Sequence, residues 1–465
     1  MNRTARVARR SLSITLLTVV LLGCFEERNR PTIPIFGSLA VNSDPQGAEI
    51  FVDEGSVGAL TPVTLDMVPA GEHLLTLVLG EGTPEVFTFS DSVVVPEEAL
   101  DSVEAALQGG CFEDCPFVLA RGRIECRITG AGDTCAGVFF DQPALEWPAG
   151  SGADYGGGGR LLVAGIIGDD GGRLAGDTLA IPVFERGAWI GRRPVTREVT
   201  QRRQELDVDY WARSPVAGRY LQGLSVLQRA ISVDSAGVED VVLLQFEVVN
   251  NSDDPLYRAL FPWIPDGGYT IRDVYLGFGL DADVGRPDDD LGTVDPELNL
   301  ALLYDADFSD SELPAEFRDR PAVVGIATIL PPEGATRRTL TFWRRSEDWD
   351  EAGAAYGFAW RLLSGQLRSD DPIGDHPAAE IGYYPGLAAD YRTIESWGPL
   401  SLAPGESTLL TVGLLLAEPV PGTFTPGTRV DPGDPSDPGR QILLVAGDLR
   451  ALAARLNEFW TRYRR

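Results

Sequence analysis

The residues of this sequence that are best suited to bind a ligand are aspartates gathered in one short stretch. Six of them fall within fifteen residues that also hold two glycines and a proline: Asp281, Asp283, Asp288, Asp289, Asp290 and Asp295. Carboxylates this close together repel one another unless a cation or solvent screens them. Calcium takes six to eight oxygen ligands, which a flexible loop can supply. The stretch therefore predicts a calcium site.

A second interpretation of the acidic stretch stays open. Aspartates are common in surface turns, where the side chain bonds to the backbone and no metal is needed. The stretch is also not an EF-hand, because Gly285 is its fifth residue and the later acids are spaced differently.

Other residues suited to catalysis are few. The chain has two histidines, His73 and His376, and neither a Gly-x-Ser-x-Gly nor a His-Glu-x-x-His motif. Nothing marks out one pair among the 69 acidic residues as a glycosidase pair. We therefore predict no catalytic residue and a protein that is not an enzyme. Six aromatic residues could stack on sugars, although such side chains more often fill a core. They are Trp343, Trp349, Trp360, Trp397, Tyr383 and Tyr384.

The N-terminal residues are typical of an export signal. Four arginines precede an apolar run of about ten residues, too short to span a bilayer. The run ends in Leu21-Leu22-Gly23-Cys24, which resembles the lipobox of bacterial lipoproteins. The resemblance implies that residues 1–23 are a signal peptide and that Cys24 becomes the lipidated first residue, although an uncleaved anchor stays open. Residues 24–36 would be a tether, and Phe25 in place of aspartate favours the outer membrane.

Apart from Cys24, the chain has four cysteines: Cys111, Cys115, Cys126 and Cys135. An even number in an exported chain predicts two disulfides, with three pairings possible. Cys126 and Cys135 flank a glycine-containing turn, which suits a bridged hairpin. The spacings do not match a zinc ribbon.

The charge of the chain limits its partners. All 39 basic residues are arginines, and the formal net charge is −30. Without residues 1–23, 35 basic residues face 69 acidic ones, which gives −34. This balance disfavours nucleic acid as a partner, although an ordinary soluble surface would explain most of it. The partners we expect are the membrane, through the lipid anchor, and a glycan or protein of the cell envelope.

Residues 37–108 are expected to form a small β domain. Short alternating runs at 38–42, 48–53 and 72–79 are separated by turn residues. These residues resemble the PEGA domain, a small β-sandwich of bacterial surface proteins, although Gln46 replaces the glutamate of the family's tetrapeptide. The resemblance implies a fold and a surface location, and no catalytic residues. It is carried by Pro45–Ala48, Val52-Asp53, Gly58, Thr61-Pro62 and Ala70–His73.

Residues 109–150 are interpreted as a cysteine-containing β segment that leads into a main domain over 151–465. Alternating and apolar runs predict strands at 161–167, 222–233, 238–250, 271–280, 322–330, 338–343 and 408–416. Residues 184–222, which are polar and lack periodicity, are expected to be a long surface loop. Helices are expected within 348–367 and over 444–463, where leucines recur at helical spacing.

The segment 119–465 also resembles a family of uncharacterised secreted and surface proteins of bacteria. The matching pieces are Leu145–Gly150, Val241–Asn251, Asp281–Gly285 and Asn299–Asp305. The resemblance implies an extracellular β-sandwich without an established activity. We therefore predict an all-β chain in which a small PEGA-like β-sandwich precedes a larger β-sandwich with long loops and a C-terminal helix. The predicted function is that of a non-catalytic, lipid-anchored structural or binding protein of the cell envelope, with calcium as a stabilising ion. The alternative is a secreted carbohydrate-active protein, either a glycan-binding protein or a glycoside hydrolase.

Overall fold

The chain divides into two compact units. The first holds Met1–Leu79 and Phe89–Leu107, and the second holds Gly80–Thr88 and Gln108–Arg465. The computed structural model describes residues 36–44, 46–53, 55–79, 87–97, 99–106, 108–109, 117–135, 143–167, 177–180, 189–191, 196–200, 202–212, 223–260, 264–295, 297–344, 358–366, 388–430 and 441–463. The predicted lipobox and tether before Phe36, and Cys111 and Cys115, lie outside these ranges.

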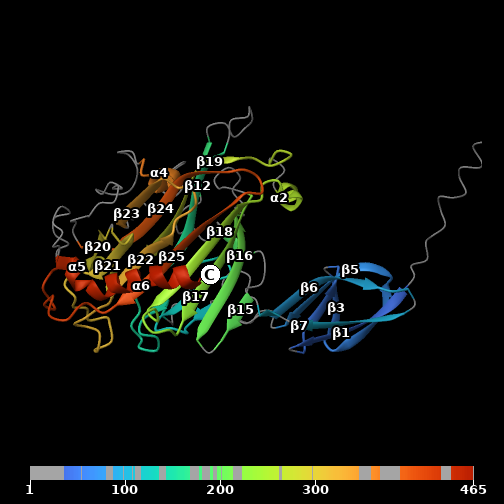
Figure 1. The fold of residues 1–465 in the computed structure, drawn as a ribbon. Coiled ribbons are helices and arrows are strands. Elements are labelled where there is room, and N and C mark those ends of the chain that lie inside the picture. Colours follow the sequence, from blue (N-terminus) through green and yellow to red (C-terminus); the bar gives the residue numbers. More distant parts are fainter. Residues whose placement is uncertain are drawn as a thin grey trace, which may run out of the picture. The chain divides into compact units, whose positions relative to one another are not determined.

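Two sheets are formed by the described residues of 36–109, a range that includes the strands of the first unit (blue in Figure 1). Their strands are β1 (Phe36–Asp44), β2 (Glu49–Val52), β3 (Gly55–Leu60), β4 (Val63–Pro69), β5 (Gly71–Leu79), β6 (Phe87–Val95), β7 (Leu100–Ala106) and β8 (Gln108–Gly109). One sheet has the order β4-β1-β7, and the other has the order β3-β2-β5-β6-β8. Alternation decides which side chains are buried: Leu39 and Val41 of β1 are buried, whereas Ala40 between them is less so.

The second unit contains two large sheets and a small one. The small sheet, in the order β11-β10-β9, joins β9 (Phe117–Leu119), β10 (Glu125–Ile128) and β11 (Leu145–Glu146). The five-stranded sheet, in the order β13-β12-β19-β24-β23, joins β12 (Gly158–Ile167), β13 (Asp177–Ala180), β19 (Ile271–Asp281), β23 (Arg337–Arg344) and β24 (Tyr391–Leu402). The nine-stranded sheet runs β14-β16-β17-β18-β25-β22-β21-β20, with β15 paired to β16. Its strands are β14 (Trp189–Gly191), β15 (Thr196–Val199), β16 (Arg203–Ala212), β17 (Leu224–Val233), β18 (Val241–Asn250), β20 (Asp290–Asp295), β21 (Leu300–Asp305), β22 (Val323–Leu330) and β25 (Ser407–Ala417).

The main hydrophobic core lies between the two large sheets. Alternate residues of β18, such as Leu244 and Phe246, are fully buried there, and so is Phe278 of β19. The rings of Phe246 and Phe278 meet with their centroids 5.8 Å apart. This is the face-to-face packing of a β-sandwich, so the predicted all-β fold is confirmed.

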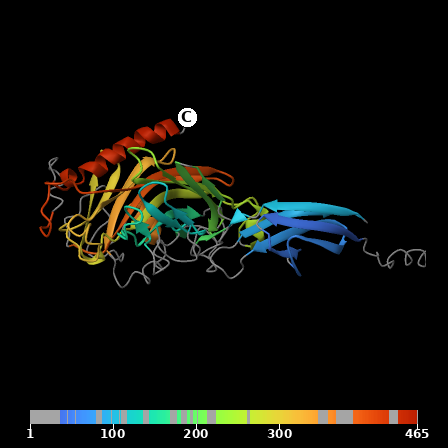
Figure 2. The same cartoon turned by 90° about the horizontal axis from the view of Figure 1, so that it is seen from below.

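A C-terminal helix covers the outer face of the nine-stranded sheet. Helix α6 (Gly447–Tyr463) follows the short α5 (Gln441–Val445) and lies along one side of the sandwich (Figure 2). Its buried face carries Leu449, Leu452 and Leu456, which form a second core with Leu415 and other residues of the sheet. The packing is close because a Cβ at Gly413 of β25 would overlap the side chain of Leu456.

The outer face of the five-stranded sheet is covered in part by the short helix α4 (Phe358–Ser364). The remaining regular elements are α2 (Pro255–Leu260) and the 3₁₀ helix η1 (Pro287–Asp289).

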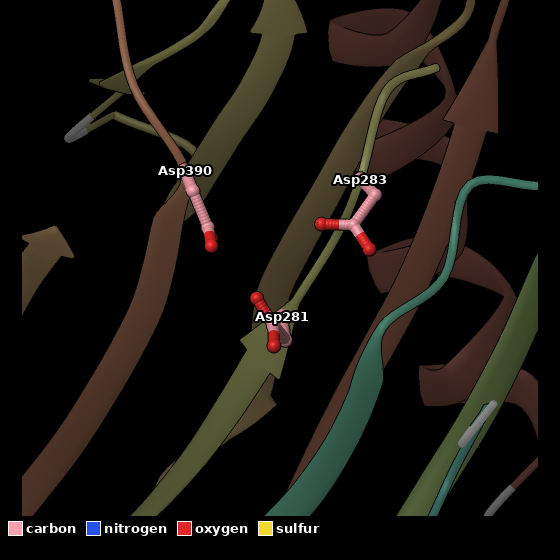
Figure 3. A group of neighbouring side chains, drawn as sticks. All are labelled: Asp281, Asp283 and Asp390. Carbon is pink, nitrogen blue, oxygen red and sulfur yellow. The ribbon is translucent and has the colours of Figure 1, made fainter. Parts of the chain in front are cut away.

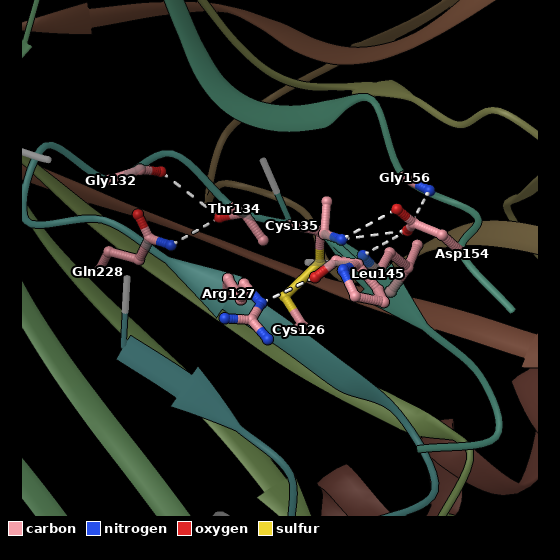
Figure 4. Close-up of a disulfide and its surroundings, with 11 residues drawn as sticks. Cys126, Arg127, Gly132, Thr134, Cys135, Leu145, Asp154, Gly156 and Gln228 are labelled. Carbon is pink, nitrogen blue, oxygen red and sulfur yellow. Dashed lines mark hydrogen bonds between the residues drawn. A yellow bond between two sulfur atoms is a disulfide. The ribbon is translucent and has the colours of Figure 1, made fainter. Parts of the chain in front are cut away.

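One disulfide joins Cys126 and Cys135, as the hairpin interpretation expected. Both cysteines are fully buried, beside the segment in which the Asp154 carboxylate accepts hydrogen bonds from the backbone N–H groups of Ala144, Leu145 and Gly156 (Figure 4). The bridge therefore holds the turn after β10 against the core.

One expectation about the secondary structure is wrong, and one long strand was missed. Residues 184–222 do not form one surface loop, because they contribute β14, β15 and β16 to the nine-stranded sheet. Strand β24, which pairs with both β19 and β23, was not predicted at all.

Candidate metal centre

The acidic stretch connects the two large sheets. It leaves the five-stranded sheet at Asp281 and enters the nine-stranded sheet at Asp290, the first residue of β20. Ala282 and Val284 are buried in the main core, and this alternation keeps the Asp281 and Asp283 carboxylates off the apolar interior. The connection thus places carboxylates where the two sheets come together.

Three carboxylates converge at the start of this connection, and we call them centre 1. Asp281, Asp283 and Asp390 each offer an oxygen, and these oxygens all lie within 4.8 Å of one another. Figure 3 shows the three side chains pointing toward a shared space. Asp390 reaches it because it precedes β24, whose Arg392 is the register partner of Asp281.

Charge and burial act together at centre 1. Burial, and then the charges of Asp281 and Asp390, raise the pKa of Asp283 to about 7, although Arg392 opposes this. The guanidinium of Arg392 donates to Asp281 Oδ2 from Nε at 2.9 Å and from Nη2 at 2.8 Å. A cation among the three oxygens would favour the ionised form of Asp283, because it would offset the repulsion from its neighbours.

A second group of carboxylates, which we call centre 2, lies beyond the 3₁₀ helix. It consists of Asp289 at the end of η1, Asp305 at the end of β21 and Asp310 in the loop that follows. Their ligand oxygens also lie within 4.8 Å of one another. Burial raises the pKa of Asp305 to about 7 and also raises that of Asp289.

The expected single site of six aspartates is therefore wrong, because the structure divides them. Asp281 and Asp283 belong to centre 1, and Asp289 belongs to centre 2. Asp290 and Asp295 stand at opposite ends of β20, about 16 Å apart at 3.3 Å per residue.

The three remaining aspartates each contact another residue of the chain. Asp288 is exposed and pairs with Arg286 at 2.8 Å. Asp295 is buried and pairs with Arg450 of α6 at 2.5 Å. Asp290 is fully buried, and its Oδ2 accepts the N–H of Val284 at 3.2 Å. Burial raises the pKa of Asp290 well above its usual value, and the charges of Asp283, Asp305 and Asp289 add to this effect.

The sequence interpretation missed three residues of the two centres. Asp390 lies more than 100 residues from Asp281, and only the pairing of β19 with β24 brings it near. Asp305 and Asp310 did carry a signal, because Asp305, Asp307 and Asp310 repeat the close spacing of Asp281 and Asp283.

The histidine that the structure describes has a structural role. His73 Nδ1 lies 2.6 Å from Asp53 Oδ2, and Nε2 lies 2.7 Å from the carbonyl oxygen of Pro69. Two acceptors require both ring nitrogens to donate, and the hydrogen bond to Asp53 raises the pKa of His73. The side chain therefore holds β5 to neighbouring turns. His376 lies outside the described residues.

Two of the candidate sugar-stacking residues make contacts within the protein. Trp360 Nε1 donates to the carbonyl of Asp273, and its ring meets Tyr275. Trp397 Nε1 donates to Thr328 Oγ1 across the sandwich. Trp343 lies on β23, whereas Trp349, Tyr383 and Tyr384 lie outside the described residues.

A groove of about 1090 Å³ lies beside the middle of β18, the ends of β22 and β24 and the start of β25. Glu247, Glu333 and Glu406 are among its lining residues. No aromatic residue is found among the described residues that line it. The groove thus offers carboxylates without the stacking surface expected of a sugar-binding cleft.

Comparison with models of protein families finds a match in the chain. Residues 36–82 match the model of the PEGA domain. The predicted PEGA domain is confirmed over these residues, whereas its predicted extension to residue 108 stays a prediction. No curated protein matches the chain. No helix among the described residues is long and apolar enough to cross a membrane.

Solved structures resemble the chain only weakly. A mutant heparan sulfate lyase HepC from Pedobacter heparinus has a TM-score of 0.24 and 8% identity, over 49% of this chain and 22% of that one. An Escherichia coli K12 protein assigned as an aldose 1-epimerase has a TM-score of 0.31 and 12% identity, over 65% of this chain and 99% of that one. A GalM/aldose epimerase homologue from C. elegans has a TM-score of 0.22 and 8% identity, over 82% and 98%. The chain spans about a fifth of the lyase, and scores this low carry no argument about function.

Proposed function

We propose that this chain is a non-catalytic structural or binding protein of the cell envelope whose main domain is stabilised by calcium at centre 1. The observation that carries the proposal is the convergence of Asp281, Asp283 and Asp390 where the two sheets of the sandwich meet. The acidic balance of the chain and its PEGA domain, a module of bacterial surface proteins, support an envelope location.

The composition of centre 1 favours a divalent cation. Its three carboxylates, when ionised, carry three negative charges, and Arg392 contributes one positive charge, so two negative charges remain to be balanced. All the side-chain ligands are oxygens, which suits calcium or magnesium rather than zinc or copper. Calcium tolerates the irregular geometry of a loop, whereas magnesium demands a near-ideal octahedron.

Calcium should raise the stability of the mature chain, and Asp283→Asn should remove much of that rise. A ligand at 100 times its Kd stabilises the folded state by about 2.7 kcal/mol for each site. The measurement is thermal unfolding in calcium and in a chelator. Asp288→Asn is the matched control, because Asp288 is an exposed aspartate of the same stretch that belongs to neither centre. An equal calcium response in wild type and Asp283→Asn would contradict a site at centre 1.

Lipid attachment at Cys24 is the second part of the proposal, and it is supported by the arginine-rich start and the Leu21-Leu22-Gly23-Cys24 sequence. Several acyl chains would anchor the protein stably, whereas a single chain binds marginally. We expect Cys24→Ser to move the protein from the membrane fraction to the soluble fraction of fractionated cells. Tight membrane association of Cys24→Ser would count against the lipobox.

A further inference from the structure

Asp305 is the most unusual carboxylate of centre 2. Its side chain is fully buried at the end of β21. Oδ1 accepts the backbone N–H groups of Asp307 at 2.9 Å and of Ser309 at 3.2 Å. Oδ2 is also buried, but has no hydrogen-bond partner among the described residues. A buried carboxylate oxygen without a partner is costly, so it calls for a ligand.

The other two carboxylates complete a pocket of oxygens around this one. Asp289 Oδ1 is likewise buried and makes no hydrogen bond within the described part of the chain. Asp310 is oriented by the backbone, because its Oδ1 accepts the N–H of Glu312 and its Oδ2 accepts the N–H of Arg286. The three carboxylates are therefore held close together.

Arginines balance buried carboxylates elsewhere in this domain. Arg450 pairs with Asp295, and Arg392 pairs with Asp281. No such ion pair reaches Asp289, Asp305 or Asp310 within the described ranges, since the nearby Arg286 directs its guanidinium to Asp288. In the described part of the chain, centre 2 thus holds three carboxylates without a direct ion pair, although the nearby charge of Arg286 partly offsets the rise in the pKa of Asp289.

We infer that Asp289, Asp305 and Asp310 form a second calcium site, separate from centre 1. Oxygens within 4.8 Å of one another can surround a single ion at calcium–oxygen distances of about 2.3–2.6 Å. A calcium ion there joins the 285–290 loop to the loop after β21, which already meet where Ala306 N–H donates to the carbonyl of Asp289 at 3.0 Å. The inference deepens the proposed calcium dependence, but it does not require centre 1 to bind.

Counting bound calcium tests the inference. Isothermal titration of the metal-free mature chain with calcium chloride should give two ions for wild type, and one ion for either Asp305→Asn or Asp283→Asn. Asparagine keeps an oxygen that can accept the backbone N–H groups of Asp307 and Ser309, which limits structural damage. Asp289→Asn gives a second test of centre 2, because the buried Asp289 Oδ1 makes no hydrogen bond among the described residues that the substitution could break. Asp288→Asn should keep both ions.

The outcomes separate the two sites. If Asp305→Asn and Asp289→Asn each lose one ion while Asp283→Asn loses none, centre 2 stands and the proposed site at centre 1 falls. If both centre 2 variants bind as many ions as wild type, the inference is overturned. Displacement of calcium by magnesium at equal concentration would overturn the assignment of calcium.

Discussion

Replacement of Arg450 by methionine should cost about 3 kcal/mol of unfolding free energy, because it leaves the buried Asp295 carboxylate without its cation. The Asp295 side chain is only 2% exposed and receives Arg450 Nε at 2.5 Å, whereas the Arg450 side chain is 32% exposed. That partial exposure keeps the expected loss at the lower end for a buried pair. The pair fastens α6 to the edge of the nine-stranded sheet, so its loss should loosen the C-terminal helix.

Denaturant unfolding followed by tryptophan fluorescence would measure this loss. Arg462→Met is the matched control on the same helix, because Arg462 makes only an exposed pair with Glu458 at 3.7 Å and should cost less than about 0.5 kcal/mol. Asp295→Asn added to Arg450→Met should restore much of the stability, since the buried charge is then removed as well. Equal losses of unfolding free energy for Arg450→Met and Arg462→Met would show that the buried pair stabilises the fold no more than the exposed pair does.

The strands that the sequence predicted are those whose apolar residues reach the core. Strand β18 is rich in Val, Leu and Phe, and it lies in the middle of the nine-stranded sheet. Strand β16 was taken for a loop because the segment around it is polar and no periodicity was recognised in it, although Glu205, Asp207 and Asp209 alternate with apolar residues. Its charges are balanced across the sheet, where Arg229 of β17 is the register partner of Asp207 and bonds to it at 2.8 and 2.9 Å. The residue pattern of one strand does not show which charged residue of a neighbouring strand will lie opposite it.

The same limit applies to the acidic centres. Asp281 and Asp283 were found because they are neighbours in the sequence, whereas Asp390 directly precedes β24 and Asp305 ends β21. Asp288, Asp290 and Asp295 were grouped with them because proximity in sequence was taken for proximity in space. The 3₁₀ helix and the extended β20 separate these carboxylates, and an arginine from the distant α6 pairs with Asp295. Composition identified the acidic connection, but only the strand pairing divides it into two centres.

Gly285→Ala should be more damaging than an ordinary glycine substitution, because it strains the backbone and disturbs centre 2 together. Gly285 has φ +79°, where an L-residue costs about 1–2 kcal/mol. A Cβ at this position would also overlap the Asp310 carboxylate. Asp310 would then lose its hydrogen bonds to Arg286 N–H and Glu312 N–H, at about 1 kcal/mol each. The expected total is about 3–4 kcal/mol.

Gly422→Ala is a matched control, since Gly422 has φ +80° and an added Cβ there meets no atom within 4 Å among the described residues. It should cost only the backbone strain of about 1–2 kcal/mol and leave calcium binding unchanged. Gly285→Ala should in addition weaken calcium at centre 2 by at least about tenfold, equal to about 1.4 kcal/mol, while centre 1 keeps its ion. If the two variants lose the same stability and bind calcium alike, the 285–290 loop moves freely relative to Asp310. Centre 2 would then not be held in place by the contacts between this loop and the loop after β21.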